Sequence, residues 1–113
     1  ALPILNYINS KFESDFNGIL VNKYSSGNDY ISDHSDNEKD ISDKGVISVS
    51  YGAVRKFRIR DKITRKIVKD IPTENYQIIE MKGNFQREFL HGIPVEKKIT
   101  DERISFTFRK HYE

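Results

Sequence analysis

The feature that most limits the fold of this chain is a run of short segments in which apolar and polar residues alternate. Alternation with a period of two turns one face of a strand to a core and the other face away from it. The segments are separated by Gly, Asn, Asp and Pro, which favour turns. Seven of them predict strands, at residues 19–24, 46–51, 54–60, 66–70, 76–81, 88–92 and 103–109. Many short strands at this spacing indicate a β-sandwich or barrel, of which the jelly-roll is one form.

One helix is expected before the strands, over residues 3–13. Pro3 suits the first turn of a helix, and apolar residues follow it at near-helical spacing, at Ile4, Leu5, Ile8 and Phe12. Residues 27–45 form the longest stretch without a convincing strand pattern, and loops of that length in compact domains are often functional. The 113 residues allow one domain, 1–113, and not two independent cores.

Composition excludes some classes of site. The chain has no cysteine, so disulfides and thiolate metal sites are excluded. No apolar run reaches the roughly 18 residues that a membrane-spanning helix needs, and no signal peptide is recognisable. We expect an intracellular, cytoplasmic or nuclear monomer. Because it starts at Ala1 and its single methionine is Met81, we also expect a piece trimmed at the N-terminus.

Charge is distributed unevenly, although the net charge is only +2. Residues 28–44 are rich in aspartate, and residues 55–69 contain eight Lys and Arg side chains, among them Arg58 and Arg60. The basic stretch predicts a hairpin whose outward cations contact phosphates. An edge hairpin whose charges only prevent aggregation explains the same pattern equally well.

The strand at residues 103–109 places Arg103, Ser105, Thr107 and Arg109 on one face. If that face is exposed, the pattern needs no further explanation. If it faces the inside of a barrel, the two guanidinium groups need anions, because an unpaired buried charge costs several kcal/mol. A small dicarboxylate would provide both partners.

Three residues have the chemistry of a metal site. His34 and Asp36 are two positions apart, so in an extended segment they project from the same side. His91 is the third candidate, and His111 is expected at the surface. Two histidines and one carboxylate make the facial triad of non-haem Fe(II) oxygenases, which leaves positions for a bidentate 2-oxo acid and for O2. A His-x-Asp pair alone is weak evidence.

Several motifs, in order, resemble the AlkB family of nucleic-acid dealkylating dioxygenases, from about residue 17 to residue 110. Asn22-Lys23-Tyr24 is similar to the Asn-x-Tyr strand of that family, and residues 34–38 to its His-x-Asp-x-Glu segment. Residues 48–57 and 91–94 are similar to later family segments. Residues 103–109 match a closing Arg-x-Asn-x-Thr-x-Arg pattern, except that Ser105 replaces asparagine.

The resemblance implies a mainly β, double-stranded β-helix fold (jelly-roll, cupin-like) with one N-terminal α-helix. It also implies an Fe(II)- and 2-oxoglutarate-dependent dioxygenase that uses O2. His34, Asp36 and His91 would be the iron ligands and the catalytic centre. Arg103 would bind the distal carboxylate of 2-oxoglutarate, and Arg109 would lie near its iron-chelating end. The remaining implied contacts are Asn22, Tyr24 and Ser105 with the co-substrate, and Asn37 and Glu38 with the target base.

The implied reaction is oxidative demethylation of N-alkylated bases, of the N1-methyladenine and N3-methylcytosine type, in DNA. Such a base must be flipped out of a duplex or presented on a single strand. Because the family's base-recognition lid lies N-terminal to the core, base selectivity is expected to be poor in this chain. The same oxygenase chemistry on RNA, protein or lipid, or a catalytically silent jelly-roll binding domain, stays open at this point.

Overall fold

The computed structural model describes residues 2–12, 15–36, 45–82 and 84–110. Its described elements are two helices and eight strands: α1 (Leu2–Phe12), β1 (Gly18–Tyr24), β2 (Ile31–His34), β3 (Val46–Gly52), β4 (Lys56–Asp61), β5 (Ile67–Pro72), β6 (Ile78–Met81), α2 (Phe85–Glu88), β7 (Phe89–Ile93) and β8 (Arg103–Arg109). In the described part of the chain, neither helix is long and apolar enough to cross a membrane.

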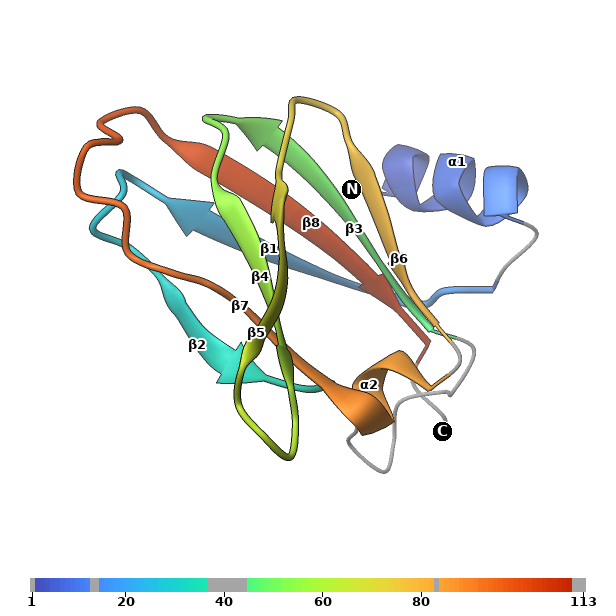
Figure 1. Ribbon diagram of the computed structural model, residues 1–113. Helices are drawn as coiled ribbons and strands as arrows, with labels where there is room; N and C mark the ends of the chain where they lie inside the picture. The colour runs from blue at the N-terminus through green and yellow to red at the C-terminus, as the bar shows by residue number, and fades with distance from the viewer. Residues whose placement is uncertain (1, 13–14, 37–44, 83, 111–113) are drawn as a thin grey trace.

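The strands form two four-stranded antiparallel sheets that face each other (Figure 1). The first sheet has the order β1-β8-β3-β6. Its β8 pairs with β1 from Gly18↔Arg109 to Tyr24↔Arg103 and with β3 on its other side. The second sheet has the order β2-β7-β4-β5, in which β7 pairs with β2 and β4. Strands that alternate between two sheets in this way are consistent with a double-stranded β-helix.

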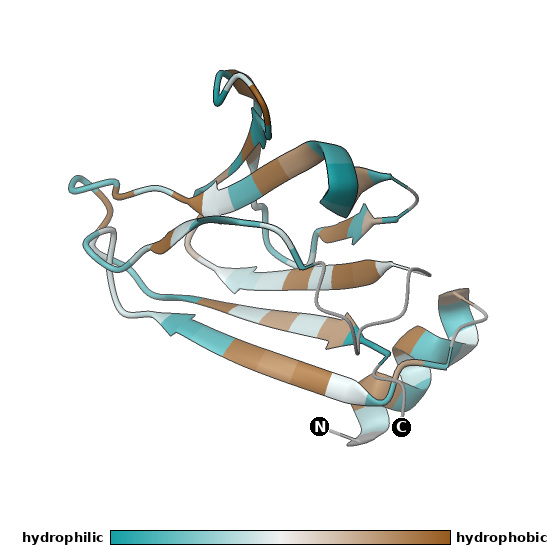
Figure 2. Ribbon diagram, turned by 90° about the horizontal axis from the view of Figure 1, so that it is seen from below, coloured by the Kyte–Doolittle hydropathy of each residue, from teal (hydrophilic) through white to brown (hydrophobic). Residues whose placement is uncertain are grey.

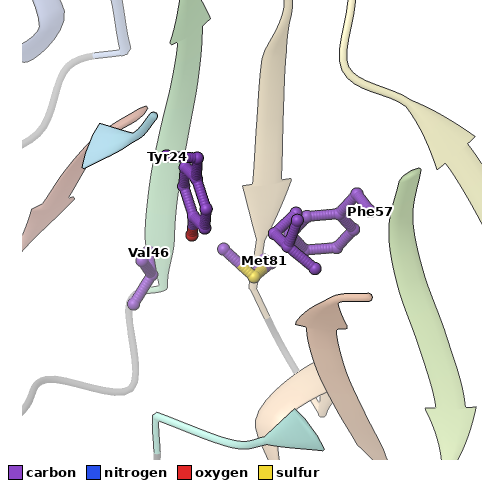
Figure 3. Close-up of a cluster of buried hydrophobic side chains, with 5 residues drawn as sticks. Tyr24, Val46, Phe57 and Met81 are labelled. Atoms are coloured by element: carbon purple, nitrogen blue, oxygen red, sulfur yellow. The ribbon is translucent and has the colours of Figure 1, made fainter. Parts of the chain in front are cut away.

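Each face of the first sheet has its own apolar cluster. On the outer face, α1 packs Ile8 against Ile47 and Phe108, which are all nearly inaccessible to solvent. Figure 2 shows α1 beside this sheet and away from the other one. A second cluster lies between the sheets and contains Tyr24, Val46, Phe57, Met81 and Ile93 (Figure 3). The first sheet therefore separates the two apolar clusters. The polar residues of β8 belong to neither cluster.

The predicted fold class is confirmed, and the predicted helix and seven strands all occur with small shifts at their ends. Two short elements were missed, namely β2 and α2. β2 reads Ile-Ser-Asp-His, with three polar residues out of four and two of them exposed, so it carries no apolar alternation. α2 is only four residues long and has no buried residue, so no amphipathic period can develop.

Candidate active site

Three potential metal ligands meet at one edge of the second sheet. Antiparallel pairing of β2 with β7 places His34 directly opposite His91, and Asp36 follows two residues after His34. The Asp36 carboxylate lies 3.7 Å from Nε2 of His34 and 3.4 Å from Nε2 of His91. One ligand atom from each residue lies within 4.8 Å of the other two. This geometry suits one cation held by two imidazoles and one carboxylate.

The surroundings of the two histidines orient their rings. Nδ1 of His34 lies 2.8 Å from the carbonyl oxygen of Ser32, so a proton on Nδ1 is donated there and Nε2 is left free as a ligand. His91 is 5% exposed. Its ring stacks on Phe57 at 5.4 Å and contacts Phe85 at 5.7 Å between centroids. These contacts direct both Nε2 atoms toward Asp36 before any metal is present.

Asp36 is the charged member of the cluster. Burial of its side chain, which is 10% exposed, opposes ionisation, yet its pKa lies below the ordinary value. The opposing causes are a hydrogen bond with His91 and electrostatic interactions with His91, Arg109 and His34. The side chain is therefore an anionic carboxylate at neutral pH, as a metal ligand must be. Its main-chain N–H donates a 2.7 Å hydrogen bond to Oε1 of Gln86.

A cavity of about 210 Å³ extends from the metal ligands to β8, where it is lined by Arg103, Ser105, Thr107 and Arg109. This is smaller than the roughly 300–1,000 Å³ typical of drug-sized ligands, so it suits a small metabolite. Arg109 lies at the end near the metal ligands, with Nη1 3.8 Å from the Asp36 carboxylate. Arg103 lies at the other end of the same strand and is 2% exposed.

The guanidinium groups in this cavity have unused donors. Nη2 of Arg103 donates to Oγ of Ser50 at 2.7 Å. Among the described residues, Nε and Nη1 of Arg103 and Nε of Arg109 are buried without a hydrogen-bond partner. Burial also lowers the pKa of Arg103, although an arginine stays protonated. Two cations with spare donors at opposite ends of a small cavity fit a dicarboxylate, whose oxygens accept such bonds.

The structure brings most of the predicted site residues together. Asn22, Tyr24 and Ser105 line the same cavity as the metal ligands. Asn37 and Glu38 lie outside the described residues. Arg58 and Arg60 lie on β4 with their charges already engaged. Arg58 donates to both oxygens of Asp70 at 2.9 and 3.1 Å.

Arg60 lies apart from the cavity lining and reaches back to the strand that carries His34. Its Nε is 2.8 Å from the Asp33 carboxylate, although the N–H is not aligned for a hydrogen bond, and Nη1 donates to the carbonyl of Arg65 at 2.9 Å. The ion pair crosses over Gly92, where an added Cβ would lie 2.7 Å from Oδ1 of Asp33. A side chain at position 92 would therefore push β2 away from β7.

Three residues of the site were not predicted. Ser50 could have been found, because it shares the inward face of β3 with Ser48. Gln86 contacts only the main-chain N–H of Asp36, and it lies in a one-turn helix with no sequence pattern. Arg55 precedes β4 and is 1% exposed, but its place in the basic stretch indicated a surface cation instead.

Comparison with known proteins agrees with this geometry. Residues 5–109 match the model of the 2OG-Fe(II) oxygenase superfamily. The human protein named DNA oxidative demethylase ALKBH2 is 31% identical over 121 residues, covering 96% of this chain and 46% of the relative. The rat protein named alpha-ketoglutarate-dependent dioxygenase alkB homolog 3 is 32% identical over 124 residues, covering 98% of this chain and 42% of the relative.

A plant relative, the Arabidopsis thaliana protein also named DNA oxidative demethylase ALKBH2, is 30% identical over 119 residues. The chain spans less than half the length of these relatives. The family match, together with the His34, Asp36 and His91 cluster, confirms the predicted AlkB-like resemblance and the predicted cofactor pair, Fe(II) and 2-oxoglutarate.

Proposed function

Since the chain belongs to the 2OG-Fe(II) oxygenase superfamily, we propose that it oxidatively demethylates N-alkylated bases, of the N1-methyladenine and N3-methylcytosine type, in DNA. One observation carries the chemical part of this proposal. A two-histidine, one-carboxylate cluster and two arginines with unused donors line the same 210 Å³ cavity. The DNA part rests on the names of relatives that are about 30% identical.

In this proposal His34, Asp36 and His91 would hold the iron. Bound Fe(II), with 2-oxoglutarate and O2, supplies the oxidation of an alkyl C–H bond while the 2-oxo acid is converted to succinate and CO2. The hydroxylated carbon then leaves as an aldehyde, and the base regains its N–H or lone pair.

The other side chains bind and orient the co-substrate. Arg103 receives the distal carboxylate through the two nitrogens that have no protein partner, and Arg109 neutralises the end nearest Asp36. Asn22, Tyr24 and Ser105 complete the polar lining. Because a serine hydroxyl is short, we expect a bridging water at position 105. Phe57 and Phe85 exclude solvent from one side of His91.

The β4–β5 hairpin is the proposed contact for the phosphate backbone. Arg58 and Arg60 are held by Asp70 and Asp33, so they contribute mainly to the local potential unless those pairs open. Direct phosphate contacts are assigned to exposed cations on the same hairpin, at Lys56, Arg65, Lys66 and Lys69. Such contacts give affinity that falls with salt and carries no sequence preference. Asn37 and Glu38 are the proposed contacts with the target base.

The proposal is tested by an anaerobic titration with Fe(II) and 2-oxoglutarate, followed by turnover on oligonucleotides that contain N1-methyladenine or N3-methylcytosine. Succinate and demethylated base should appear in equal amounts. Matched RNA strands separate the two nucleic acids, and a Lys66→Glu, Lys69→Glu variant tests the hairpin, because charge reversal should raise KM for the strand. Binding of both cofactors without any demethylated base would contradict the assigned substrate.

A further inference from the structure

Arg55 is one of the most deeply buried charged residues of the described chain, at 1% exposure, although it lies in the basic stretch next to an exposed hairpin. Its guanidinium group donates mainly to main-chain oxygens. Nη1 donates to Ser26 at 3.1 Å, and Nη2 donates to Asp29 and Pro94 at 2.8 Å each. Nε faces the carboxylate of Glu96 at 3.4 Å. One side chain therefore satisfies oxygens from residues 26–29 and residues 94–96.

These two segments are the loops that follow β1 and β7, and they pack closely. The N–H of Gly27 donates to Ile99 at 2.7 Å, and the carbonyl of Gly27 accepts from the N–H of Glu96 at 2.8 Å. A Cβ at position 27 would lie 1.7 Å from the Glu96 oxygen, so only glycine permits this approach. The guanidinium of Arg55 links the two loops further, because it donates hydrogen bonds to main-chain oxygens of both. We call this contact between the loops the loop joint.

The same guanidinium reaches the co-substrate pocket through Tyr24. Tyr24 is the last residue of β1, directly before the first of these loops, and it lies opposite Arg103 in the sheet. The Arg55 guanidinium carbon is 5.5 Å from the centre of the Tyr24 ring, and that of Arg103 is 5.1 Å from the same centre. Both distances are in the range of cation–π attraction. Tyr24 therefore has a cation from the loop joint and a cation from the pocket near its ring.

The Arg55 guanidinium is buried with its hydrogen-bonding groups satisfied, by three main-chain oxygens and by the Glu96 carboxylate. A buried guanidinium loses several kcal/mol of hydration, and this one also has Arg103 nearby. The positive charge of Arg55 is among the causes that lower the pKa of Arg103. A carboxylate bound at Arg103 would offset this repulsion between the two cations.

We propose that Arg55 is a positioning residue for the distal carboxylate of the co-substrate. It fixes the ring of Tyr24, and through that ring it fixes the orientation of Arg103, so that the pocket selects a dicarboxylic 2-oxo acid over a monocarboxylic one. The inference rests on the proposed function, since it assigns the distal carboxylate to Arg103.

The test compares 2-oxoglutarate with 2-oxobutyrate, which has the same 2-oxo acid group but no distal carboxylate. Binding to the Zn(II)-loaded chain, which cannot turn over, is measured by calorimetry. Arg55→Lys keeps the charge but not the planar fork, and Arg55→Met removes both. We expect Arg55→Lys to weaken 2-oxoglutarate by about tenfold and Arg55→Met by more, in the range seen for residues that orient a binding group. Affinity for 2-oxobutyrate should stay within about twofold.

Arg87→Met is the matched control, because Arg87 is an exposed arginine on α2. It should change neither affinity. Equal weakening of both acids by Arg55→Lys would mean that the site has loosened as a whole, and it would overturn the inference. Unchanged affinities would do so as well. If the unsubstituted chain bound neither acid, the proposed function would fail together with the inference.

A measurement on the unsubstituted chain keeps the inference testable if both Arg55 variants fail to fold. With ¹⁵N-labelled arginine and Zn(II), the Arg55 side-chain N–H signal should shift when 2-oxoglutarate is added and stay in place with 2-oxobutyrate. A signal that responds equally to both acids, or to neither, would overturn the assignment to the distal carboxylate.

Discussion

The two walls of the pocket are built differently. The metal wall is the β2–β7 edge, with His34, Asp36 and His91. Its strand β2 has four residues, lies at the edge of its sheet and pairs regularly with β7 only at Ile31↔Ile93 and His34↔His91. The carboxylate wall is β8 with its neighbours β1 and β3. β8 has seven residues and is hydrogen-bonded on both sides along its length.

We therefore expect the metal wall to gain stability when its cation binds, whereas strand pairing alone forms the carboxylate wall. Two of the three ligands of the metal wall, His34 and Asp36, lie at or just after the end of a short, irregularly paired edge strand, so we expect a bound cation to hold that strand more firmly. The carboxylate wall is formed by regular strand pairing on both sides of β8, and it buries guanidinium nitrogens without partners. Such groups destabilise the free protein and favour ligand binding. Substitutions in the two walls should therefore change stability in different ways.

The largest effect is expected for His34→Ala, which removes a ligand from the metal wall. Turnover should fall below detection. The metal-free variant should lose only about 1 kcal/mol of stability, because the His34 side chain is 35% exposed. In the unsubstituted chain, Zn(II) at about a hundred times its Kd should add ~2.7 kcal/mol, or about 10–20 °C in Tm.

Thermal unfolding with and without Zn(II) checks this prediction. The increase in Tm on adding metal should be absent or small in the variant. A large loss of stability in the metal-free variant would show that the metal wall is already formed by folding. The proposed difference between the two walls would then be wrong.

The next effect is expected for Arg103→Met in the carboxylate wall. Affinity for 2-oxoglutarate should fall by at least about thirtyfold, corresponding to ~2 kcal/mol or more for a buried charged contact. The free variant should be as stable as the original chain or more stable. It loses the hydrogen bond to Ser50, but it also loses the burial of a charge with two unpaired nitrogens.

Calorimetry with 2-oxoglutarate and Tm of the ligand-free protein measure the two quantities separately. A Tm that falls by many degrees would identify Arg103 as a structural residue. Its unpaired nitrogens would then not destabilise the ligand-free protein.

A smaller effect is expected for Gln86→Ala, which tests what holds the metal wall in place. Gln86 accepts the N–H of Asp36, and its own carbonyl accepts Nζ of Lys62 at 2.7 Å. Loss of the side-chain acceptor should weaken Zn(II) binding by about tenfold and leave 2-oxoglutarate binding to Arg103 nearly unchanged.

Gln77→Ala is the control for this substitution. Gln77 also accepts a main-chain N–H, from Glu74 at 2.9 Å, but on the exposed loop before β6. It should leave the metal affinity unchanged. Equal metal affinities for both variants would show that Asp36 needs no support from α2.

The carboxylate wall could be predicted from sequence much better than the support of the metal wall. Arg103, Ser105, Thr107 and Arg109 share a face because a strand has a period of two, and that period is visible in seven consecutive residues. His34 and Asp36 were found in the same way, by a spacing of two. In each case the functional residues follow the geometry of one continuous segment.

Residues that act through main-chain groups left no such pattern. Arg55 binds carbonyl oxygens of Ser26, Asp29 and Pro94, and every residue type offers a carbonyl. Gln86 binds an N–H, which is equally general. β2 was missed because three of its four residues are polar, so it shows no apolar alternation. The assignment of Arg58 and Arg60 to phosphate stays a prediction. Their pairing with Asp70 and Asp33 is visible only in the three-dimensional structure.

The smallest effect is expected for Arg60→Met compared with Arg58→Met, and it tests how far the support of the metal wall extends. Both arginines lie on β4 and both are paired with an aspartate. Arg60 pairs with Asp33 on β2, one residue before His34, whereas Arg58 pairs with Asp70 on β5.

Each pair is part-exposed and should contribute only about 0.2–1 kcal/mol to stability. Only the loss of Arg60 should also weaken Zn(II) binding, by about twofold to fivefold, because it releases one side of β2. Both variants remove one positive charge from the hairpin and release one carboxylate, Asp33 beside His34 in the first and Asp70 on β5 in the second. Equal metal affinities would mean that the Gly92 contact and the pairing with β7 are enough to hold β2. The Arg60–Asp33 ion pair would then not support the metal ligands.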